Sequence, residues 1–223
     1  MMATAREMAR ERFTEDIVAA ATRQLAELGA SGLSLRSVAR ELGVASSAVY
    51  RYVPSRDALL TELILRAYWD LGEAATTAER LRAREDHAGR FRAVTGAIRS
   101  WARAHPHRYA LIFGSPVPGY VAPRETVAAA TIATMLLVTV IQDAHGGAPD
   151  DERGPGLEPG IAAQVGYTGP MRYLTEGIRT WSETYGLISF ELFGHLVGSV
   201  ADADAFFDAA VDSMVARLEL VEA

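Results

Sequence analysis

The sequence predicts an all-α protein with a small N-terminal helix-turn-helix domain and a larger helical domain after it. Apolar residues recur every three or four positions through most of the chain, which is typical of helices with one buried face. Glycine and proline interrupt this pattern often enough to leave helices of ordinary length. No stretch of consequence alternates as a β-strand does, and no internal repeat is found. We therefore expect nine or ten helices, divided between residues 1–56 and residues 57–223.

The helix-turn-helix pattern lies in residues 34–56, SLRSVARELGVASSAVYRYVPSR. Val38 and Leu42 are four residues apart and fall on one helical face. Gly43 follows that face, where a helix end favours a left-handed residue. A second helix, with its own apolar pair, is expected before Pro54, which cannot continue a helix ladder. In the helix-turn-helix motif the second helix enters the DNA major groove.

The exposed side of this motif carries hydroxyl and guanidinium groups, and such groups contact phosphates and base edges. The alternative is an ordinary amphipathic helical hairpin with a solvated face. Charge favours DNA, because residues 1–56 carry a net charge of +2 and residues 57–223 carry −8. The predicted DNA-binding residues are Ser34, Arg36, Ser46, Ser47, Tyr50, Arg51, Tyr52 and Arg56.

The first helix is expected over residues 12–28, with its apolar face packed behind the helix-turn-helix. Residues 1–11 contain Arg6 and Arg10 among small and acidic residues, and we interpret them as a frayed tail. The alternative is an arm that becomes ordered on DNA and reaches the minor groove or the phosphates.

The run GLSLRSVARELGVASSAVYRYVPSRDALL, residues 32–60, resembles the DNA-binding domain of the TetR family of bacterial transcriptional regulators. The helix before it, with Ile17, Val18, Ala21 and Leu25 ahead of Gly29, matches as well. One departure is Ala45, where many members place a capping Ser or Thr, so Ser46 is interpreted as the cap. The resemblance implies a homodimer that binds a palindromic DNA operator and releases it when a small molecule enters the C-terminal ligand-binding and dimerisation domain.

The rest of the chain is interpreted as a series of helices. Ser55 is placed to cap the helix that follows the helix-turn-helix. This helix leaves the DNA-binding domain directly, and a change in its angle would change the spacing of the two recognition helices in a dimer. The expected helices cover residues 56–75, 89–104, 106–113, 124–143, 169–198 with a bend near Gly186, and 202–220. Residues 76–88 are interpreted as a linker or helix end, residues 114–123 as an irregular loop, and residues 145–160 as a mobile loop. The segment SWARAHPHRYALIFGSPVPGYVAP, residues 100–123, resembles the WHG-type subclass of TetR C-terminal domains.

Three glycines, Gly186, Gly194 and Gly198, lie among large apolar residues in the expected long helix. Glycine costs roughly 1 kcal/mol in a helix interior relative to alanine, and close helix approach is a sufficient reason for that cost. The family resemblance implies a dimer interface on the last two long helices, and the alternative is an internal packing site. The assigned interface residues are Leu187, Phe190, Gly194, Phe206, Ala210 and Met214.

A ligand pocket is expected among bulky or polar-tipped residues on the central helices, because binding pockets are largely apolar with a few placed polar groups. Each of these residues, taken alone, is more typical of a core. The candidates are Trp101, His105, Tyr109, Phe113, Met135, Thr139, Tyr173 and Trp181. We expect an effector that is apolar or aromatic and carries no strong formal charge.

Enzymatic functions are not supported. The chain has no cysteine, which removes disulfides, thiolate metal ligands and cysteine nucleophiles. Its histidines lack HExxH spacing, Ser115 is not in a GxSxG turn, and residues 154–160 lack the GxGxxG spacing, so no metal or cofactor is expected.

The N-terminus has no apolar signal core, and the most apolar run, Val127–Ile141, is shorter than the roughly 20 residues that span a bilayer. A cytoplasmic location away from membranes is therefore expected. The function predicted is ligand-responsive repression, and an effector-independent DNA-binding protein or an activator remain alternatives.

Overall fold

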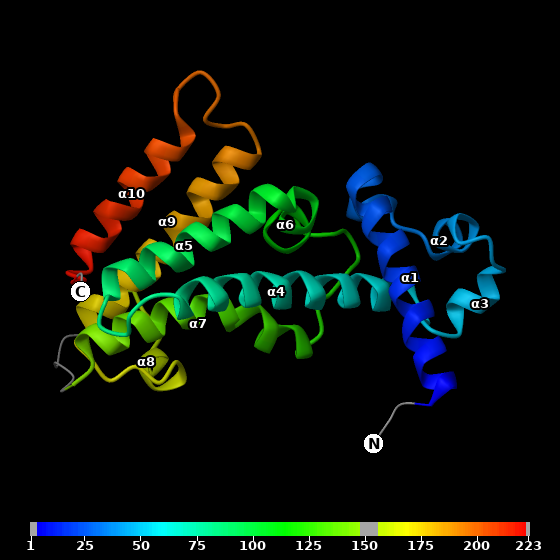
Figure 1. Cartoon of the computed structure of the whole chain (residues 1–223), viewed down its shortest axis with the longest axis horizontal. Helices are drawn as coiled ribbons and strands as arrows, with labels where there is room; N and C mark the ends of the chain where they lie inside the picture. The colour runs from blue at the N-terminus through cyan, green and yellow to red at the C-terminus, as the bar shows by residue number, and fades with distance from the viewer. Residues whose placement is uncertain (1–3, 148–155, 222–223) are drawn as a thin grey trace. The chain divides into compact units, whose positions relative to one another are not determined.

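The computed structural model describes residues 4–147 and 156–221, which form ten α-helices and one short 3₁₀ helix and contain no β-strand (Figure 1). The predicted all-α class is confirmed. The elements are α1 (Ala5–Leu28), η1 (Ala30–Gly32), α2 (Leu35–Glu41), α3 (Ser46–Tyr50), α4 (Arg56–Arg80), α5 (His87–Ala104), α6 (Pro106–Phe113), α7 (Glu125–His145), α8 (Ile161–Gln164), α9 (Met171–Leu192) and α10 (Ala203–Arg217). Half of the loop expected over residues 145–160, namely residues 148–155, lies outside the described residues.

The chain divides into two compact units, and two helices run through both. The first unit contains Met1–Tyr68 and His105–Ala129, and the second contains Trp69–Ala104 and Ala130–Ala223. Both boundaries at Tyr68 and Ala129 fall inside helices, α4 and α7. The first unit therefore includes α6 and the loop after it, in addition to the helix-turn-helix.

Residues 4–11 are helical or cap the helix, so the expectation of a frayed tail is wrong for them. Thr4 and Glu7 form a capping box, in which Glu7 N–H donates to Thr4 Oγ1 at 3.3 Å and Thr4 N–H donates to Glu7 Oε2 at 2.7 Å. The Thr4 backbone bond also lowers the pKa of Glu7. A capping box satisfies two N-terminal amides at once, so α1 begins at Ala5 instead of residue 12.

Helix α4 begins as predicted, because Ser55 Oγ accepts a hydrogen bond from Ala58 N–H at 3.0 Å. It continues to Arg80, five residues beyond the predicted end, so part of the expected linker is helical. In the second unit α4 closely approaches α7, since a Cβ built on Gly72 would lie 2.6 Å from Ile132 Cγ2. Glycine is required at that crossing because any side chain would separate the two helices.

Helix α7, Glu125–His145, lies close to the predicted range 124–143 and extends beyond the apolar run Val127–Ile141. It spans 21 residues and is long and apolar enough to cross a bilayer by length and composition alone, so the length argument against a membrane is wrong. The core helix of a soluble protein passes the same criteria. Ala133, Leu137, Val140 and Ile141 of α7 are buried inside the chain. Other positions are half-exposed and Val127 is exposed, so this helix is covered less completely than expected.

Helix α9 is continuous through Gly186 and ends at Leu192, so it is shorter than the predicted range 169–198. Gly194 and Gly198 lie in the turns beyond it with φ of 78° and 81°. Both glycines adopt the left-handed backbone conformation that other residues rarely adopt. They are therefore not in a helix interior, and the inference that they permit close helix approach there is wrong. Helix α10 then begins at Ala203, where Asp202 Oδ1 accepts hydrogen bonds from the Asp204 and Ala205 amides.

Candidate DNA-reading surface and effector cavity

The turn between α2 and α3 has the predicted geometry. Gly43 has a φ of 68°, and Val44 N–H donates to Ala39 C=O at 3.0 Å across the end of α2. This bond closes α2 as in a Schellman motif and sends the chain back toward the core. Val38 and Val49 are fully buried in the core of the first unit. Burial of these two side chains in one core thus holds α2 and α3 in a fixed arrangement.

The exposed side of α3 carries the groups suited to DNA. Ser47, Tyr50 and Arg51 are three and four residues apart, so their side chains lie on one face, opposite the buried Val49. All three are exposed, and Tyr50 retains 45% of its accessible surface although it is a large ring. Arg36 is exposed on α2. A phenol and a guanidinium that point to solvent from a short helix can reach base edges and phosphates.

Two of the predicted DNA-binding residues have side-chain contacts within the protein. Tyr52 is half-buried and packs edge-to-face against Phe13 with ring centroids 4.8 Å apart. Arg56 donates from Nη2 to Ala30 C=O at 2.9 Å and from Nε to Leu33 C=O at 3.2 Å. Arg56 therefore connects the start of α4 to the chain just before α2.

The capping interpretation at α3 is corrected by the structure. Ala45 is the N-cap and offers no side-chain bond, while Ser46 is the first helical residue and is half-buried. Ser34 is the N-cap of α2, and its side chain makes no capping bond. Local capping thus contributes nothing to α3, whose position depends on the burial of Val49.

Long-range ion pairs hold the helices around α3. Arg23 of α1 donates to Glu41 of α2 at 2.6 Å, which lowers the pKa of Glu41. Arg66 of α4 donates to both carboxylate oxygens of Glu15 on α1 at 2.7 Å and to Glu62 at 2.6 Å. The same bond from Arg66 lowers the pKa of Glu15. Sequence reasoning missed the Arg23–Glu41 and Arg66–Glu15 pairs, because partners 18 and 51 residues apart share no local spacing.

We expect Arg56→Ala to destabilise the first unit as well as weaken DNA binding. The substitution removes two charge-assisted hydrogen bonds to the Ala30 and Leu33 carbonyls. A bond to a charged group contributes about 1.5–3 kcal/mol when buried, and this site is partly exposed, so we expect a loss of about 1–2 kcal/mol in total. Urea denaturation measures the loss. Arg40→Ala is the control, because its guanidinium donates only to the neighbouring Ser37 hydroxyl among the described bonds. Equal stability of the two variants would show that the Arg56 contacts are unimportant.

Helix α6 and the loop after it pack onto the same core as the helix-turn-helix. Leu111, Val117 and Tyr120 are partly buried against that core. The Tyr120 hydroxyl and Thr61 Oγ1 of α4 are 2.9 Å apart and share a hydrogen bond. Tyr68 of α4 donates to Ile112 C=O at 3.4 Å. Helix α6 directly follows α5 in the chain. Through these contacts with α4, α6 and its loop link α5 to the first unit.

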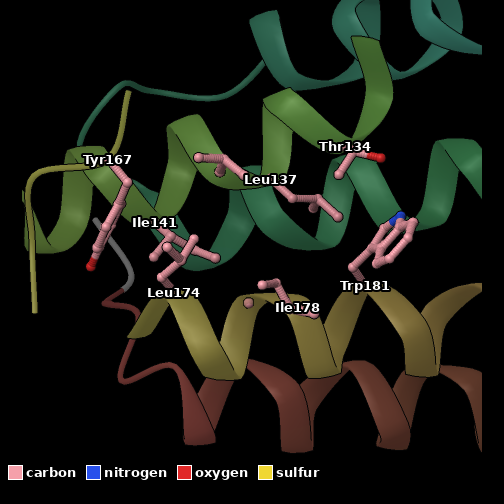
Figure 2. A pocket seen from close by; sticks show the side chains of 9 residues that line it. Thr134, Leu137, Ile141, Tyr167, Leu174, Ile178 and Trp181 are labelled. Atoms are coloured by element: carbon pink, nitrogen blue, oxygen red, sulfur yellow. The ribbon is translucent and has the colours of Figure 1, made fainter. Parts of the chain in front are cut away.

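The second unit contains an apolar cavity between α7 and α9 (Figure 2). It is partly open to solvent and its volume is only about 30 Å³, so a ligand must displace some of its lining. In Figure 2, Tyr167, Ile141 and Leu174 lie at one end and Trp181 lies at the other. The lining residues are Thr134, Leu137, Val138, Ile141, Tyr167, Leu174, Gly177, Ile178 and Trp181. No charged side chain is among them, which suits an uncharged apolar molecule.

Trp181 is the one predicted pocket residue that lines this cavity. Tyr109 and Phe113 belong to the first unit, where their rings pack 5.0 Å apart, and His105 is exposed at the start of α6. Tyr173 stacks on His145 with centroids 3.6 Å apart. Trp101 is buried on α5, while Met135 and Thr139 are half-buried on α7 and do not line the cavity.

A sequence signal for the cavity existed but was overlooked. The α7 lining residues fall at positions 134, 137, 138 and 141, and the α9 lining residues at 174, 177, 178 and 181. Both sets have the same spacing, which defines one helical face on each element. The prediction favoured bulky polar-tipped residues and passed over leucine, isoleucine and glycine. Among the described residues no group of three or more His, Asp or Glu is arranged to hold a metal ion.

Large apolar side chains are exposed where α9 ends and α10 begins. Phe190 and Phe193 lie at the end of α9, Val197 lies in the turns, and Phe206 lies in the first turns of α10. Of the other residues assigned to the dimer interface, Leu187 and Ala210 are half-buried. Met214 is fully buried in its own chain, where the Thr184 hydroxyl lies 3.5 Å from its Sδ, so it cannot face a partner.

Comparison with known proteins gives matches over both parts of the chain. Residues 17–63 match the family model described as "Bacterial regulatory proteins, tetR family", and residues 91–214 match "Tetracyclin repressor-like, C-terminal domain". The second match includes residues 100–123, the segment that suggested the WHG-type subclass. The chain is 38% identical over 224 residues to HTH-type transcriptional regulator Rv1816 of Mycobacterium tuberculosis, with 94% of each chain covered.

Solved structures give the same result. The structure of SCO4313, which carries the description of a regulatory protein, has a TM-score of 0.75 and 31% identity, covering 96% of this chain and 100% of that one. The structure of a TetR variant from Acinetobacter baumannii in complex with minocycline has a TM-score of 0.53 and 18% identity, covering 93% and 96%. The second likeness shows the shared fold alone.

Proposed function

This chain belongs to the TetR family of bacterial transcriptional regulators, and we propose that it is a ligand-responsive repressor that binds a palindromic operator as a homodimer. Regulators of this family bind DNA and small-molecule effectors, are dimeric and are not enzymes. They are typically soluble and cytoplasmic, and we place this chain in the cytoplasm as well. The finer proposal is that a small uncharged organic effector releases this protein from its operator.

The observation that carries the proposal is the exposed face of α3. Ser47, Tyr50 and Arg51 face solvent on a helix whose opposite side is fully buried, which fits base reading in a major groove. Arg36 on α2 supplies a further cation. We propose that residues 1–56 make the DNA contacts and that residues 57–223 provide ligand binding and dimerisation, with α6 and its loop transmitting between them.

The exposed apolar residues at the end of α9 support dimerisation. Phe190, Phe193 and Phe206 would be shielded from water by a second copy that presents the same surface. We propose Leu187, Phe190, Gly194, Phe206 and Ala210 as interface residues. A two-fold dimer presents two α3 helices, and operator binding requires them to be spaced by about 34–36 Å, one turn of DNA.

The cavity suggests how an effector would change that spacing. Its α7 wall belongs to the same helix whose first turns lie in the first unit. The loop before α7 contains Tyr120, which shares a hydrogen bond with Thr61 of α4. A ligand that separates α7 from α9 would therefore shift the loop and α4, and with them α3. We propose this as the release mechanism, with Trp181 among the effector contacts.

A gel-shift experiment tests the DNA-binding part. The probe is a duplex spanning the non-coding DNA next to this protein's own coding sequence, with random-sequence competitor. We expect a specific shift that disappears when unlabelled probe is added. A folded dimer that gives no specific shift would contradict the proposal. Transcription from the same DNA in a reporter distinguishes repression from activation, the third possibility.

We expect Gly177→Leu to abolish the effector response without loss of DNA binding. A Cβ at Gly177 would lie 2.6 Å from Ile141 Cδ1, so a leucine fills the space that the ligand needs. The assay is thermal shift with a panel of uncharged apolar and aromatic compounds, because a ligand that binds the folded state raises the melting temperature by mass action. Gly96→Leu is the control, since Gly96 on α5 has open space around it. If no compound shifts wild type, the effector-independent alternative is favoured. If both variants respond as wild type does, the cavity is not the effector site.

A further inference from the structure

The first turns of α1 carry two arginines on a face that leads to the recognition segment. Arg6 and Arg10 are four residues apart, and Phe13 and Ile17 continue the same helical face. Ile17 is fully buried, and Phe13 packs against Tyr52. The guanidinium of Arg10 lies 5.8 Å from the centroid of the Tyr52 ring. The face therefore runs from the core, past Tyr52, to the exposed Arg6 and Arg10.

The acidic residues of these turns lie on a different side of α1. Glu7, Glu11 and Glu15 are spaced by four residues and form their own stripe. Glu7 is occupied by the capping box with Thr4, and Glu15 is occupied by its bidentate pair with Arg66. Among residues 4–147 and 156–221, Arg6 and Arg10 form no ion pair, and both are exposed. Glu7 lies three residues from Arg10 but is bound to Thr4, so both guanidinium groups are available to an anionic partner.

We propose that Arg6 and Arg10 contact DNA phosphates beside the bases that α3 reads, so that the interface extends along the backbone onto α1. This inference rests on the proposed DNA-binding function. Guanidinium groups pair with phosphate oxygens through two parallel N–H donors, and such contacts fix register without reading sequence. Tyr52 is then a positioning residue, because its ring holds the Arg10 guanidinium through a cation–π contact while Phe13 holds the ring.

The capping box explains how this surface is formed before DNA binds. Residues 4–12 are exposed and bury no apolar side chain, so the core does not account for the extra turns of α1. The Thr4 and Glu7 bonds supply the start of the helix, and the helix places Arg6 one turn beyond Arg10. A preformed arginine face loses less conformational freedom on binding than a frayed tail would.

The test is the salt dependence of DNA binding by the full-length protein. Binding of an Arg6→Ala/Arg10→Ala variant to a random-sequence duplex and to the non-coding probe is measured by fluorescence anisotropy at several KCl concentrations. Each phosphate contact contributes about 0.9 to the slope of log affinity against log salt, so the slope should fall by about 2. Affinity at low salt should fall about 10-fold or more on both duplexes alike. Arg12→Ala is the matched control, because Arg12 is exposed on α1 but off this face.

A second variant separates DNA contact from a role in folding. Arg6→Gln keeps a good helix former at a position whose side chain makes no hydrogen bond, ion pair or ring contact in the described part of the chain, so its melting temperature should equal that of wild type. Its slope should fall by about 1. Wild-type affinity and slope in both variants would overturn this inference while leaving the proposed function intact. Wild-type protein that binds neither duplex would instead overturn the proposed function.

Discussion

Tyr50→Ala combined with Arg51→Ala is expected to lower operator affinity by about 30-fold or more while the fold stays intact. Both side chains leave the exposed face of α3 and neither supports the core, which rests on Val49. A good contact to a base edge is worth about 1–3 kcal/mol, so two contacts together account for about 2–6 kcal/mol. Because about 1.4 kcal/mol corresponds to tenfold in affinity, the expected loss follows directly. Fluorescence anisotropy with the shifted probe measures it, and the melting temperature confirms folding.

The matched control is Leu81→Ala combined with Arg82→Ala. This pair also joins a large exposed side chain to an arginine, but it lies in the turn after α4 in the second unit. Operator affinity should be unchanged in the control. If the α3 variant binds as tightly as the control does, α3 is not the recognition helix and the interface must be sought elsewhere.

The second large effect is expected at Arg90, which is 1% exposed and lies at the centre of a buried charge cluster. Its Nε donates to Glu79 Oε1 of α4 at 2.7 Å, its Nη2 lies 2.8 Å from Asp143 Oδ2 of α7, and its Nη1 donates to Arg84 C=O at 3.0 Å. Arg90→Ala leaves the nearly buried Glu79 without its closest cation. Removing one partner of a buried pair typically costs about 3–5 kcal/mol.

We place the expected loss for Arg90→Ala near the lower end, about 3 kcal/mol, because Arg84 also reaches both acids and can partly compensate. Urea denaturation measures the change. The control is Arg92→Ala on the same helix, whose pair with Asp212 is largely exposed and should contribute no more than about 1 kcal/mol. Similar losses of unfolding free energy in the two variants would mean that the Arg90 cluster does not stabilise the fold more than an exposed ion pair does.

The Arg90 cluster also has a functional consequence. It joins the second-unit ends of α4 and α7, the two helices that run through both units. A variant that loosens this end should therefore transmit effector binding less well, even at temperatures where it remains folded. The ratio of operator affinity with and without the effector, measured on Arg90→Ala and Arg92→Ala, tests this consequence.

Much of the fold follows from short-range patterns. The Val38–Leu42 spacing, Gly43 and Pro54 predicted the helix-turn-helix, and Ser55 predicted the start of α4, because periodicity and capping involve residues within one or two turns. The same rules failed where the local signal was misinterpreted. Thr4 and Glu7 form a capping box that the frayed-tail interpretation overlooked, and Gly194 and Gly198 were placed inside a helix that ends before them.

The sequence by itself determined the helical class, the position of the helix-turn-helix and the family, since these depend on residues close together in the chain. Tertiary structure alone decided which residues line the cavity, that Tyr120 meets Thr61, and that Arg99 of α5 pairs with Glu191, 92 residues away. The physical reason is that a side chain's long-range partner is selected by how whole helices pack, and many partners of the same charge or polarity satisfy the local pattern equally well.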